Sequence, residues 1–319
     1  MPSWGQILNE IQASLKTNGM GFDALSHVRN KYLSQLSQLT GRDTIIYASR
    51  WTQGDSPPQL VSINEEDVHA FMEALYGLDG KALDLILHTG GGSAETAEAL
   101  ISYLRQKYDD IRVIVPQAAM SAGTMLACAG NTIVMGKQSS LGPIDPQIIL
   151  QTQVGLRAVP AHAILDQFEM AKEDCGKNPK NLGVWMPMLS QYGPALLIQC
   201  KNHIRFSKEL VEGWLSAFMF KGETTELPSK IANYLSDHGN FNTHSKHVNL
   251  EASITLGLKI QQLESDQNLQ EAVLSAFHAT MHSFGMSPAA KIVANHKGNC
   301  YIKMNNIQLP KKPSQASAA

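Results

Sequence analysis

The chain has 319 residues, of which 43% are hydrophobic and 17% are charged. That balance allows one large or two ordinary domains with a sizeable core, and it excludes wholesale disorder. With 26 basic and 28 acidic residues the net charge is −2, which argues against a broad nucleic-acid-binding surface.

The cysteines and the apolar segments exclude further classes of protein. The four cysteines are scattered and form no CxxC pair, so neither a zinc cluster nor a disulfide framework is expected. The N-terminus lacks a basic stretch followed by an apolar run, and no segment reaches the roughly 18 apolar residues of a bilayer span. We therefore expect a soluble cytoplasmic protein that needs neither a metal nor an organic cofactor.

The pattern of apolar residues divides the chain into four parts. Residues 1–40 predict an N-terminal helical extension of two amphipathic helices, which meet near Asn18. Residues 41–265 predict the main α/β domain, and residues 266–309 predict a C-terminal helix with a closing strand. Residues 310–319 have nothing to bury and are expected to form a disordered tail.

The main domain begins with a strand and a capped helix. The apolar run Thr44–Tyr47 predicts the strand, and a polar loop with two prolines follows it. Ser62–Glu65 has the residues of a capping box, which predicts the start of the helix. The spacing of Phe71 and Met72 places both on the buried face of that helix.

Short apolar strands then alternate with helices, with the strands at 83–87, 111–115 and 132–135. A strand–helix repeat of this length predicts a parallel sheet with right-handed crossovers. In such sheets ligands bind at the carboxyl ends of the strands, which is where the turns after the first two strands fall. Residues 160–236 predict a mostly helical insertion.

These two turns are suited to chemistry. In the first, 88–93, three glycines let the backbone approach a ligand and point N–H groups at an anion, although a plain tight turn has the same composition. In the second, Ser121 lies between alanine and glycine where a strand meets a helix. A helix N-terminus favours negative charge on a hydroxyl or on an adjacent tetrahedral oxygen. The alternative interpretation is a helix-capping serine.

The order of the motifs resembles one family of peptidases. The motifs are the glycine turn at 87–92, Ala-Met-Ser-Ala-Gly-Thr at 119–124, Ser-Ser-Leu-Gly-Pro-Ile-Asp-Pro-Gln at 139–147, and the Glu-Ala and Gly-Leu pairs within 251–258. Together they are similar to the serine dehydrogenase proteinase family, a branch of the Clp-fold peptidases that include the Clp proteolytic subunit and signal peptide peptidase A. The resemblance covers roughly residues 40–262.

This resemblance implies a Clp/crotonase-like parallel sheet and a serine peptidase that acts on polypeptides through an acyl-enzyme on Ser121. It also implies an oxyanion hole made by the backbone N–H groups of Gly91 or Gly92 and of Ala122. Family members usually have proline where this chain has Gly90, a change that loosens the loop and keeps its N–H donors. Because enzymes of this fold typically form closed assemblies, a homo-oligomer is expected.

Three residues are candidates for removing the proton of Ser121. Clp-type peptidases have a histidine after the serine helix and an aspartate before the closing helix. Here the two residue types are exchanged, which gives a triad of Ser121, His244 and Asp145. Signal peptide peptidase A uses a lysine instead, and Lys172 lies at a comparable spacing, where partial burial would make it a base. His162 is the third candidate. The alternatives are a surface histidine, a turn aspartate and a solvated lysine.

Two other classes of function stay open at this point. A crotonase-type acyl-thioester enzyme shares the fold and the paired N–H donors but needs no serine nucleophile. A non-catalytic scaffold would keep the turns and lack a nearby base. The chain has no GxxxxGK[ST] motif, so a peptidase would need a separate ATPase or adaptor to unfold its substrates.

Overall fold

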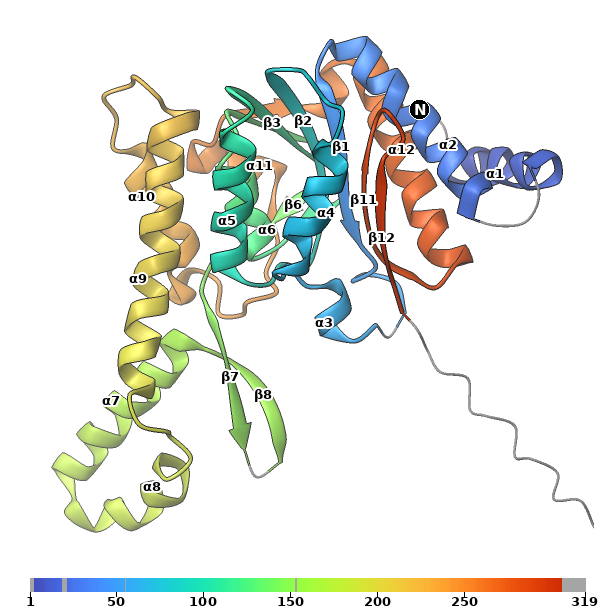
Figure 1. Ribbon diagram of the computed structural model, residues 1–319. Helices are drawn as coiled ribbons and strands as arrows, with labels where there is room; N and C mark the ends of the chain where they lie inside the picture. The colour runs from blue at the N-terminus through green and yellow to red at the C-terminus, as the bar shows by residue number, and fades with distance from the viewer. Residues whose placement is uncertain (1–2, 19–21, 55, 153, 306–319) are drawn as a thin grey trace, which may run out of the picture.

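The computed structural model describes residues 3–18, 22–54, 56–152 and 154–305. Within them a seven-stranded sheet forms the centre of the molecule (Figure 1), in the order β10-β5-β3-β2-β1-β11-β12. Its strands are β1 (Asp43–Ser49), β2 (Ala82–His88), β3 (Asp110–Val115), β5 (Thr132–Met135), β10 (Ile260–Gln262), β11 (Ala289–Asn295) and β12 (Cys300–Met304). The five strands from β10 to β1 are parallel, as predicted, and the last two are antiparallel.

Alternation of side chains along the strands gives the sheet two buried faces. On one face Leu85 and Leu87 of β2 pack with α4 (Glu66–Leu75), α5 (Ala94–Arg105) and α6 (Ala122–Cys128). On the other face Ile86 packs with the two long helices α2 (Phe22–Thr40) and α12 (Gln267–Met286). The helix α1 (Trp4–Asn18) packs against both α2 and α12. The fold class is therefore a covered α/β sheet with the predicted N-terminal helices.

A small second sheet lies at the carboxyl end of the parallel strands. It consists of β4 (Ala118–Ala119), β6 (Ser140–Leu141) and β9 (Val248–Asn249), in the order β4-β6-β9. The strand β9 leads directly into α11 (Leu250–Leu256), the predicted closing helix. This sheet fixes the segment that precedes Ser121 beside the segment that precedes Asp145.

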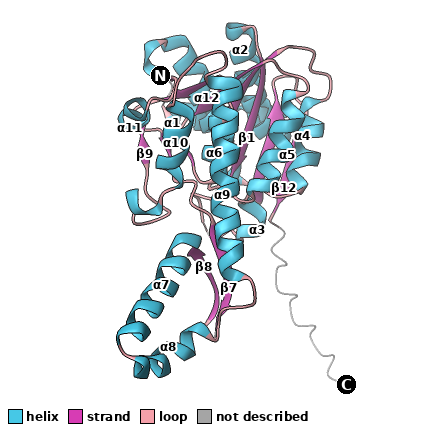
Figure 2. Ribbon diagram, turned by 90° about the vertical axis from the view of Figure 1, so that its left-hand side faces the viewer, coloured by secondary structure: helices cyan, strands magenta, loops and turns pink. Residues whose placement is uncertain are grey.

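The helical insertion is present and projects from the body of the molecule. It contains α7 (Ala161–Lys177), α8 (Leu182–Leu189), α9 (Leu196–Trp214) and α10 (Leu227–Ser236). A hairpin of β7 (Gln147–Thr152) and β8 (Gly155–Pro160), which the sequence analysis did not predict, precedes it. We call β7, β8, α7 and α8 the arm. Figures 1 and 2 show the arm extending away from the central sheet, joined to it by α9.

The helix after β1 begins later than predicted. A one-turn helix, α3 (Pro58–Val61), precedes it. The predicted capping box would start the helix directly after Ser62, but α4 starts at Glu66. Asn64 Oδ1 accepts from the Glu66 N–H (3.1 Å), and Asp67 Oδ2 accepts from the Asn64 N–H (3.0 Å). Asp67 is buried because its other oxygen binds Lys291 Nζ at 2.6 Å. Met72 is consequently turned outward and is 53% exposed, so its predicted burial is wrong.

The C-terminal part adds the strands β11 and β12 to the main sheet and covers one of its faces with the helix α12. The prediction of a helix and a closing strand is right for α12 and β12, but it lacks β11. The predicted tail at 310–319 lies outside the described residues. None of the helices in the described part of the chain combines the length and apolar composition needed to cross a membrane.

Candidate active site

The two turns selected from the sequence lie in contact. The Thr89 N–H donates to the Ala118 carbonyl (3.2 Å), and the Met120 N–H donates to the Thr89 carbonyl (2.9 Å). A Cβ placed on Gly91 would lie 2.7 Å from Ser121 Cβ, so only glycine allows this approach. The glycine turn after β2 therefore lies directly beside Ser121, as the sequence analysis expected.

Ser121 has an unusual backbone conformation at the start of α6. Its φ of 52° and ψ of −120° lie in a region that residues with a side chain rarely adopt, at a cost on the order of 1–3 kcal/mol. Hydrogen bonds on both sides hold it there. The Gly123 N–H donates to the Met120 carbonyl, and the Gly142 N–H donates to Thr124 Oγ1, each at 2.8 Å. Such strained residues cluster at functional sites.

Two backbone N–H groups near Ser121 lack an acceptor. The Gly91 N–H donates to Thr89 Oγ1 (3.1 Å), and the Gly91 carbonyl accepts from the Ile63 N–H (2.8 Å). By contrast, the N–H groups of Gly92 and Ala122 have no hydrogen-bond acceptor among the residues that the structure describes. Since most N–H groups in folded proteins are paired, these two are available to a ligand.

Ser121 opens into a cavity of about 180 Å³. The residues that line it and carry polar groups used below are Gly92, Ser93, Glu95, Ser121, Ala122, His203 and Ser207. A hydroxyl and the two unpaired N–H groups therefore face one small space. A carbonyl carbon beside the hydroxyl can place its oxygen toward the N–H groups, which is the arrangement for acyl transfer.

The aspartate and histidine of the predicted triad are in contact. Asp145 Oδ1 lies 2.6 Å from His244 Nδ1, and Asp145 Oδ2 lies 2.9 Å from His238 Nδ1. The carboxylate is fully buried, whereas both imidazoles are partly exposed. The contact with His238 was not predicted, because the sequence does not show which histidine of this segment turns inward.

The structure does not join this pair to the serine. No hydrogen bond connects Ser121 Oγ to a residue within the described ranges, and His244 does not line the cavity of Ser121. Ile144 and Pro146 do line that cavity, while the side chain of Asp145 between them is buried against the histidines. Only the Asp145–His244 half of the predicted triad is therefore assembled.

The other two candidate bases have different surroundings. Lys172 is 57% exposed on the arm and forms a surface ion pair with Glu169 at 2.6 Å, so it lacks the partial burial that would make it a base. His162 lies in the first turn of α7, whose Ala161 N–H donates to the Pro146 carbonyl (2.9 Å). Its Nε2 is buried and has no partner in the described part of the chain.

The sequence analysis missed His203. The helix α9 directs His203 and Ser207, one turn apart, into the cavity of Ser121. His203 Nδ1 lies 3.9 Å from Glu95 Oε1 of α5. A histidine four residues before a serine on an amphipathic helix is a weak signal, and nothing in the sequence indicates that α9 crosses the start of α6.

A second serine is hydrogen-bonded to a histidine. Ser140 Oγ lies 2.6 Å from His247 Nδ1. Ser140 is only 6% exposed, however, and it lies within the small sheet. It therefore offers a substrate neither access nor a helix N-terminus.

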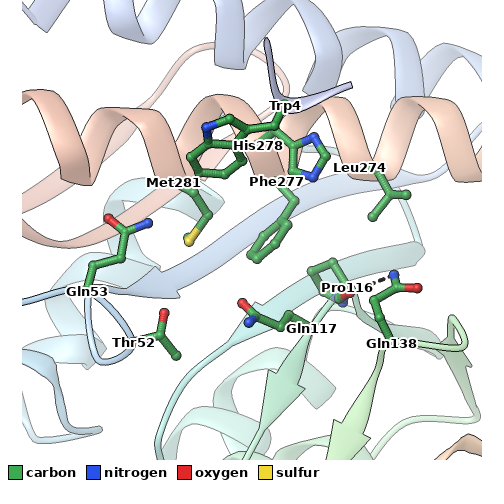
Figure 3. Close-up of a pocket in the computed structure, with 10 residues that line it drawn as sticks. All are labelled: Trp4, Thr52, Gln53, Pro116, Gln117, Gln138, Leu274, Phe277, His278 and Met281. Carbon is green, nitrogen blue, oxygen red and sulfur yellow. Dashed lines mark hydrogen bonds between the residues drawn. The ribbon is translucent and has the colours of Figure 1, made fainter. Parts of the chain in front are cut away.

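A larger cavity, of about 640 Å³, lies on the opposite face of the sheet. Figure 3 shows Phe277 and Met281 of α12 above it and Thr52 and Gln117 below it. The described residues that line it include no serine, cysteine or charged side chain. It is therefore less suited to nucleophilic chemistry than the smaller cavity around Ser121.

The histidine before the glycine turn is buried beside this larger cavity. The ring of His88 lies 5.6 Å from Trp51 and 5.1 Å from Phe277, measured between ring centroids. Burial lowers its pKa from the usual 6.5 to about 4. His88 is thus neutral at physiological pH and is not placed to act on Ser121, because it packs on the α12 face.

Comparison with known families agrees with this site. The model of a family described as ClpP-like SDH-type serine proteinase matches residues 58–178. The family resemblance is confirmed over this segment. The ClpP-like segment contains the glycine turn, Ser121 and Asp145, and it ends before His203 and His244.

Two relatives match shorter parts of the chain. The uncharacterized protein MJ0137 of Methanocaldococcus jannaschii is 44% identical over 92 residues, which are 28% of this chain and 32% of the relative. The uncharacterized protein MJ1495 of the same organism is 42% identical over 66 residues, which are 21% of this chain and 23% of the relative. The chain therefore matches less than a third of the length of either relative.

Solved structures of the 1510-N membrane-bound stomatin-specific protease give weaker matches. One mutant form has a TM-score of 0.38 at 15% identity and covers 66% of this chain and 79% of its own. Another mutant form, in complex with a substrate peptide, has a TM-score of 0.37 at 18% identity and covers 64% and 69%. These values are too low to bear on the activity of this chain.

Proposed function

We propose that this protein is a serine peptidase in which Ser121 forms an acyl-enzyme. The observation that carries the proposal is the pair of unpaired N–H groups, from Gly92 and Ala122, in the cavity of the Ser121 hydroxyl. Ser121 Oγ attacks the scissile carbonyl carbon, and the carbonyl oxygen becomes an oxyanion between the two N–H groups. Their donation costs no reorganisation, since they are already fixed by the turn and the start of α6.

The glycine turn provides one donor in preference to its neighbour. The Gly91 N–H is occupied by Thr89 Oγ1, so Gly92 is the donor that we assign to the oxyanion hole. Gly92 is held by the backbone of Ile63, which a Cβ on Gly92 would approach to 2.3 Å. Loss of one donor of this kind typically reduces the rate by about a hundredfold or more.

The proposal also requires a group that accepts the proton of Ser121. The Asp145–His244 contact provides the carboxylate and imidazole of the sequence-based triad, but neither residue lines the cavity of Ser121. The exposed ion pair of Lys172 does not support a serine–lysine dyad. The identity of the nucleophile does not depend on which imidazole accepts the proton.

Labelling with a fluorescent fluorophosphonate tests the nucleophile. We expect the wild-type protein to form a stable adduct at Ser121 and the Ser121→Ala variant to form none. Ser140→Ala is the matched control, because Ser140 is bonded to a histidine but is buried outside the cavity, and it should label as the wild type does. An adduct mapped to Ser140, or no adduct at all, would refute the proposal.

The finer features of the function follow from the family resemblance and stay proposals. We propose that the substrate is a polypeptide, bound as an extended strand at the edge of the small sheet. We also propose a cytoplasmic location and a separate ATPase or adaptor for folded substrates. Release of fluorescent peptides from labelled casein by the wild type, and none by Ser121→Ala, would support the polypeptide substrate.

The arm supports the proposed homo-oligomer. Several of its large apolar side chains are exposed, including Leu156 on the hairpin, Met170 on α7 and Val184 on α8. Exposed apolar groups that gather on one segment mark interaction surfaces. We expect light scattering to give a multimeric mass for the wild type and a smaller one for Val184→Asp, whereas a monomeric wild type would contradict this part of the proposal.

A further inference from the structure

We infer that His203 is the general base for Ser121 and that Glu95 positions its imidazole. This inference rests on the proposed peptidase function and assigns the proton acceptor of that same site. It differs from the sequence-based triad, which gives this role to His244. Residues of α5 and α9, two helices far apart in the sequence, would complete the site around the start of α6.

The first argument is the placement of His203. It is the only imidazole among the described residues that line the cavity of Ser121. The helix α9 packs against α6, and Ser207, one turn after His203, faces the same cavity. Because residues four apart lie on one face of a helix, this face of α9 forms one wall of the cavity.

The second argument is the support given to Glu95. The Ser93 hydroxyl caps α5 by accepting from the Thr96 N–H and donates to Glu95 Oε2, both at 2.9 Å. The other oxygen, Oε1, lies 3.9 Å from His203 Nδ1. At 3.9 Å the two groups are not hydrogen-bonded. Catalytic contacts are often long before substrate binds, and a shorter contact here would hold the proton on Nδ1 and leave Nε2 as the acceptor.

The third argument is the absence of competing charges around the imidazole. Glu95 and His203 are the only titratable side chains among the described residues of the cavity lining. The lining contributed by α6 and by 144–147 is uncharged. On α9 itself, the neighbouring Arg205 is bonded to Asn202. Glu95 is therefore the charged partner of His203 within the cavity lining.

The pair formed by His244 has a different character. Both oxygens of its carboxylate partner, Asp145, are occupied by imidazoles, and the carboxylate is fully buried. Neither Asp145 nor His244 lines the cavity of Ser121. We call Asp145, His238 and His244 the brace, because they lie behind the cavity wall formed by Ile144. By contrast, the side chains of Glu95 and His203 are 58% and 45% exposed.

The proton transfers balance with these groups. As Ser121 Oγ bonds to the carbonyl carbon, its proton moves to His203 Nε2, and the imidazolium is stabilised by Glu95. The imidazolium then protonates the amine nitrogen as the carbon–nitrogen bond breaks. In the second half, water gives a proton to the same nitrogen while its oxygen bonds to the ester carbon. The bond between that carbon and Ser121 Oγ then breaks, the imidazolium returns the proton to Oγ, and the carboxylic acid leaves.

The test measures the rate of fluorophosphonate labelling of Ser121 as a function of pH. In the wild type we expect the rate to fall on acidification, because a protonated base cannot accept the proton of Ser121. His203→Gln should slow labelling by about a hundredfold or more and remove this pH dependence. His27→Gln is the control, since His27 is an exposed histidine of α2 outside the cavity, and it should keep the wild-type rate and profile.

A second pair of variants tests the positioning role of Glu95. Glu95→Gln should slow the labelling of Ser121, since the imidazole loses the group that orients it, and Glu95→Asp should restore part of the rate. Equal circular dichroism and melting temperatures would show that the variants fold. If Ser121 labels normally in His203→Gln with an unchanged profile, His203 is not the base. If the wild type fails to label at Ser121, the peptidase function fails with it.

Discussion

Two polar clusters lie on either side of the segment around Asp145, and they differ in how far their hydrogen bonds are satisfied. On one side both oxygens of the Asp145 carboxylate are bound by histidines. On the other side the Ser121 hydroxyl and the N–H groups of Gly92 and Ala122 have no acceptor or donor among the described residues. Polar groups that are left unpaired in a folded protein call for a ligand or a reaction. The first cluster therefore behaves as structure and the second as a site.

The satisfied cluster has a mechanical role. Asp145 holds the imidazoles of two histidines that follow α10, and the Ile144 N–H donates to the Leu235 carbonyl at the end of α10 (2.9 Å). Ile144 faces the cavity of Ser121. These contacts fix one wall of the cavity. Their loss should lower the free energy of unfolding more than it lowers the rate of labelling of Ser121.

The largest effect is expected from a methyl group on the glycine turn. Gly91→Ala would place its Cβ 2.7 Å from Ser121 Cβ and from the Met120 carbonyl oxygen, at a φ of +103°. The turn and the nucleophile must then separate, which removes the alignment of the hydroxyl with the N–H donors. We expect labelling of Ser121 to slow by at least about a hundredfold.

The control for this change lies in the same turn. At Gly90 a new Cβ would meet only the ring of Trp51, at 3.2 Å, and no backbone atom of the site. Gly90→Ala should retain labelling within about tenfold of the wild type, a loss smaller than that of a single oxyanion-hole donor. Comparable losses in both variants would mean that any disturbance of the turn is enough to slow labelling. The close approach of Gly91 to Ser121 would then not be the cause of the effect.

The second prediction removes the brace. Asp145→Ala leaves two partly exposed histidines without their shared acceptor, and loss of hydrogen bonds to a charged group costs about 1.5–3 kcal/mol. Urea unfolding should show that decrease in the free energy of unfolding. Asp79→Ala is the control, since Asp79 is 91% exposed and forms only a surface ion pair, so its effect should stay within about 1 kcal/mol. If Asp145→Ala lowered the free energy of unfolding as little as the control does, Asp145 would not have the structural role that we assign to it.

The same comparison explains what the sequence could reveal. The contact between the two turns at Ser121 was predictable because glycine and other small residues mark places where the backbone approaches another group closely. The parallel sheet followed from buried strands at regular spacing. The half of the triad that formed, Asp145 with His244, followed from residue types in known motifs.

What could not be predicted depends on contacts between distant segments. His203 reaches the cavity only because α9 packs across α6. The spacing of residues along the sequence does not indicate such a contact between distant helices. The hairpin of β7 and β8 is only partly buried, through Ile148, Leu150 and Val159. Its apolar residues 148–150 follow one another directly in the sequence, so the sequence lacks the alternation by which half-buried strands are recognised. The burial of Asp67 depends on Lys291 in β11, so the sequence did not show that Met72 is exposed, although Phe71 is buried as predicted.

The third prediction concerns a polar group that is unpaired but inaccessible. His88 Nδ1 is buried and has no hydrogen-bond partner among the described residues, and burial lowers the pKa of His88 to about 4. Between pH 6.5 and 4 the unfolded chain therefore binds a proton that the folded chain does not, so stability falls on acidification. The loss from this residue amounts to about 3 kcal/mol at pH 4.

A variant isolates this contribution. His88→Gln cannot titrate, so its free energy of unfolding should fall less steeply between pH 7 and pH 4 than that of the wild type. The slope is the quantity to compare, because the substitution also changes packing against Trp51 and Phe277. Parallel pH curves for the two proteins would show that His88 is not the buried group that resists protonation.

The smallest effect is expected on the arm. Lys172 and Glu169 are both exposed and form a surface ion pair within α7, and such pairs contribute up to about 1 kcal/mol. Lys172→Met should change the free energy of unfolding by no more than this. In this variant the rate of fluorophosphonate labelling of Ser121 should also follow the wild-type pH profile, because the Lys172 ammonium is solvated and lies outside the cavity. A loss of labelling as large as that of Gly91→Ala would instead make Lys172 the base, and it would require the arm of this or another copy of the chain to reach Ser121. The site around Ser121 would then include a residue of the arm, and the comparison of the two polar clusters would have to include the arm as well.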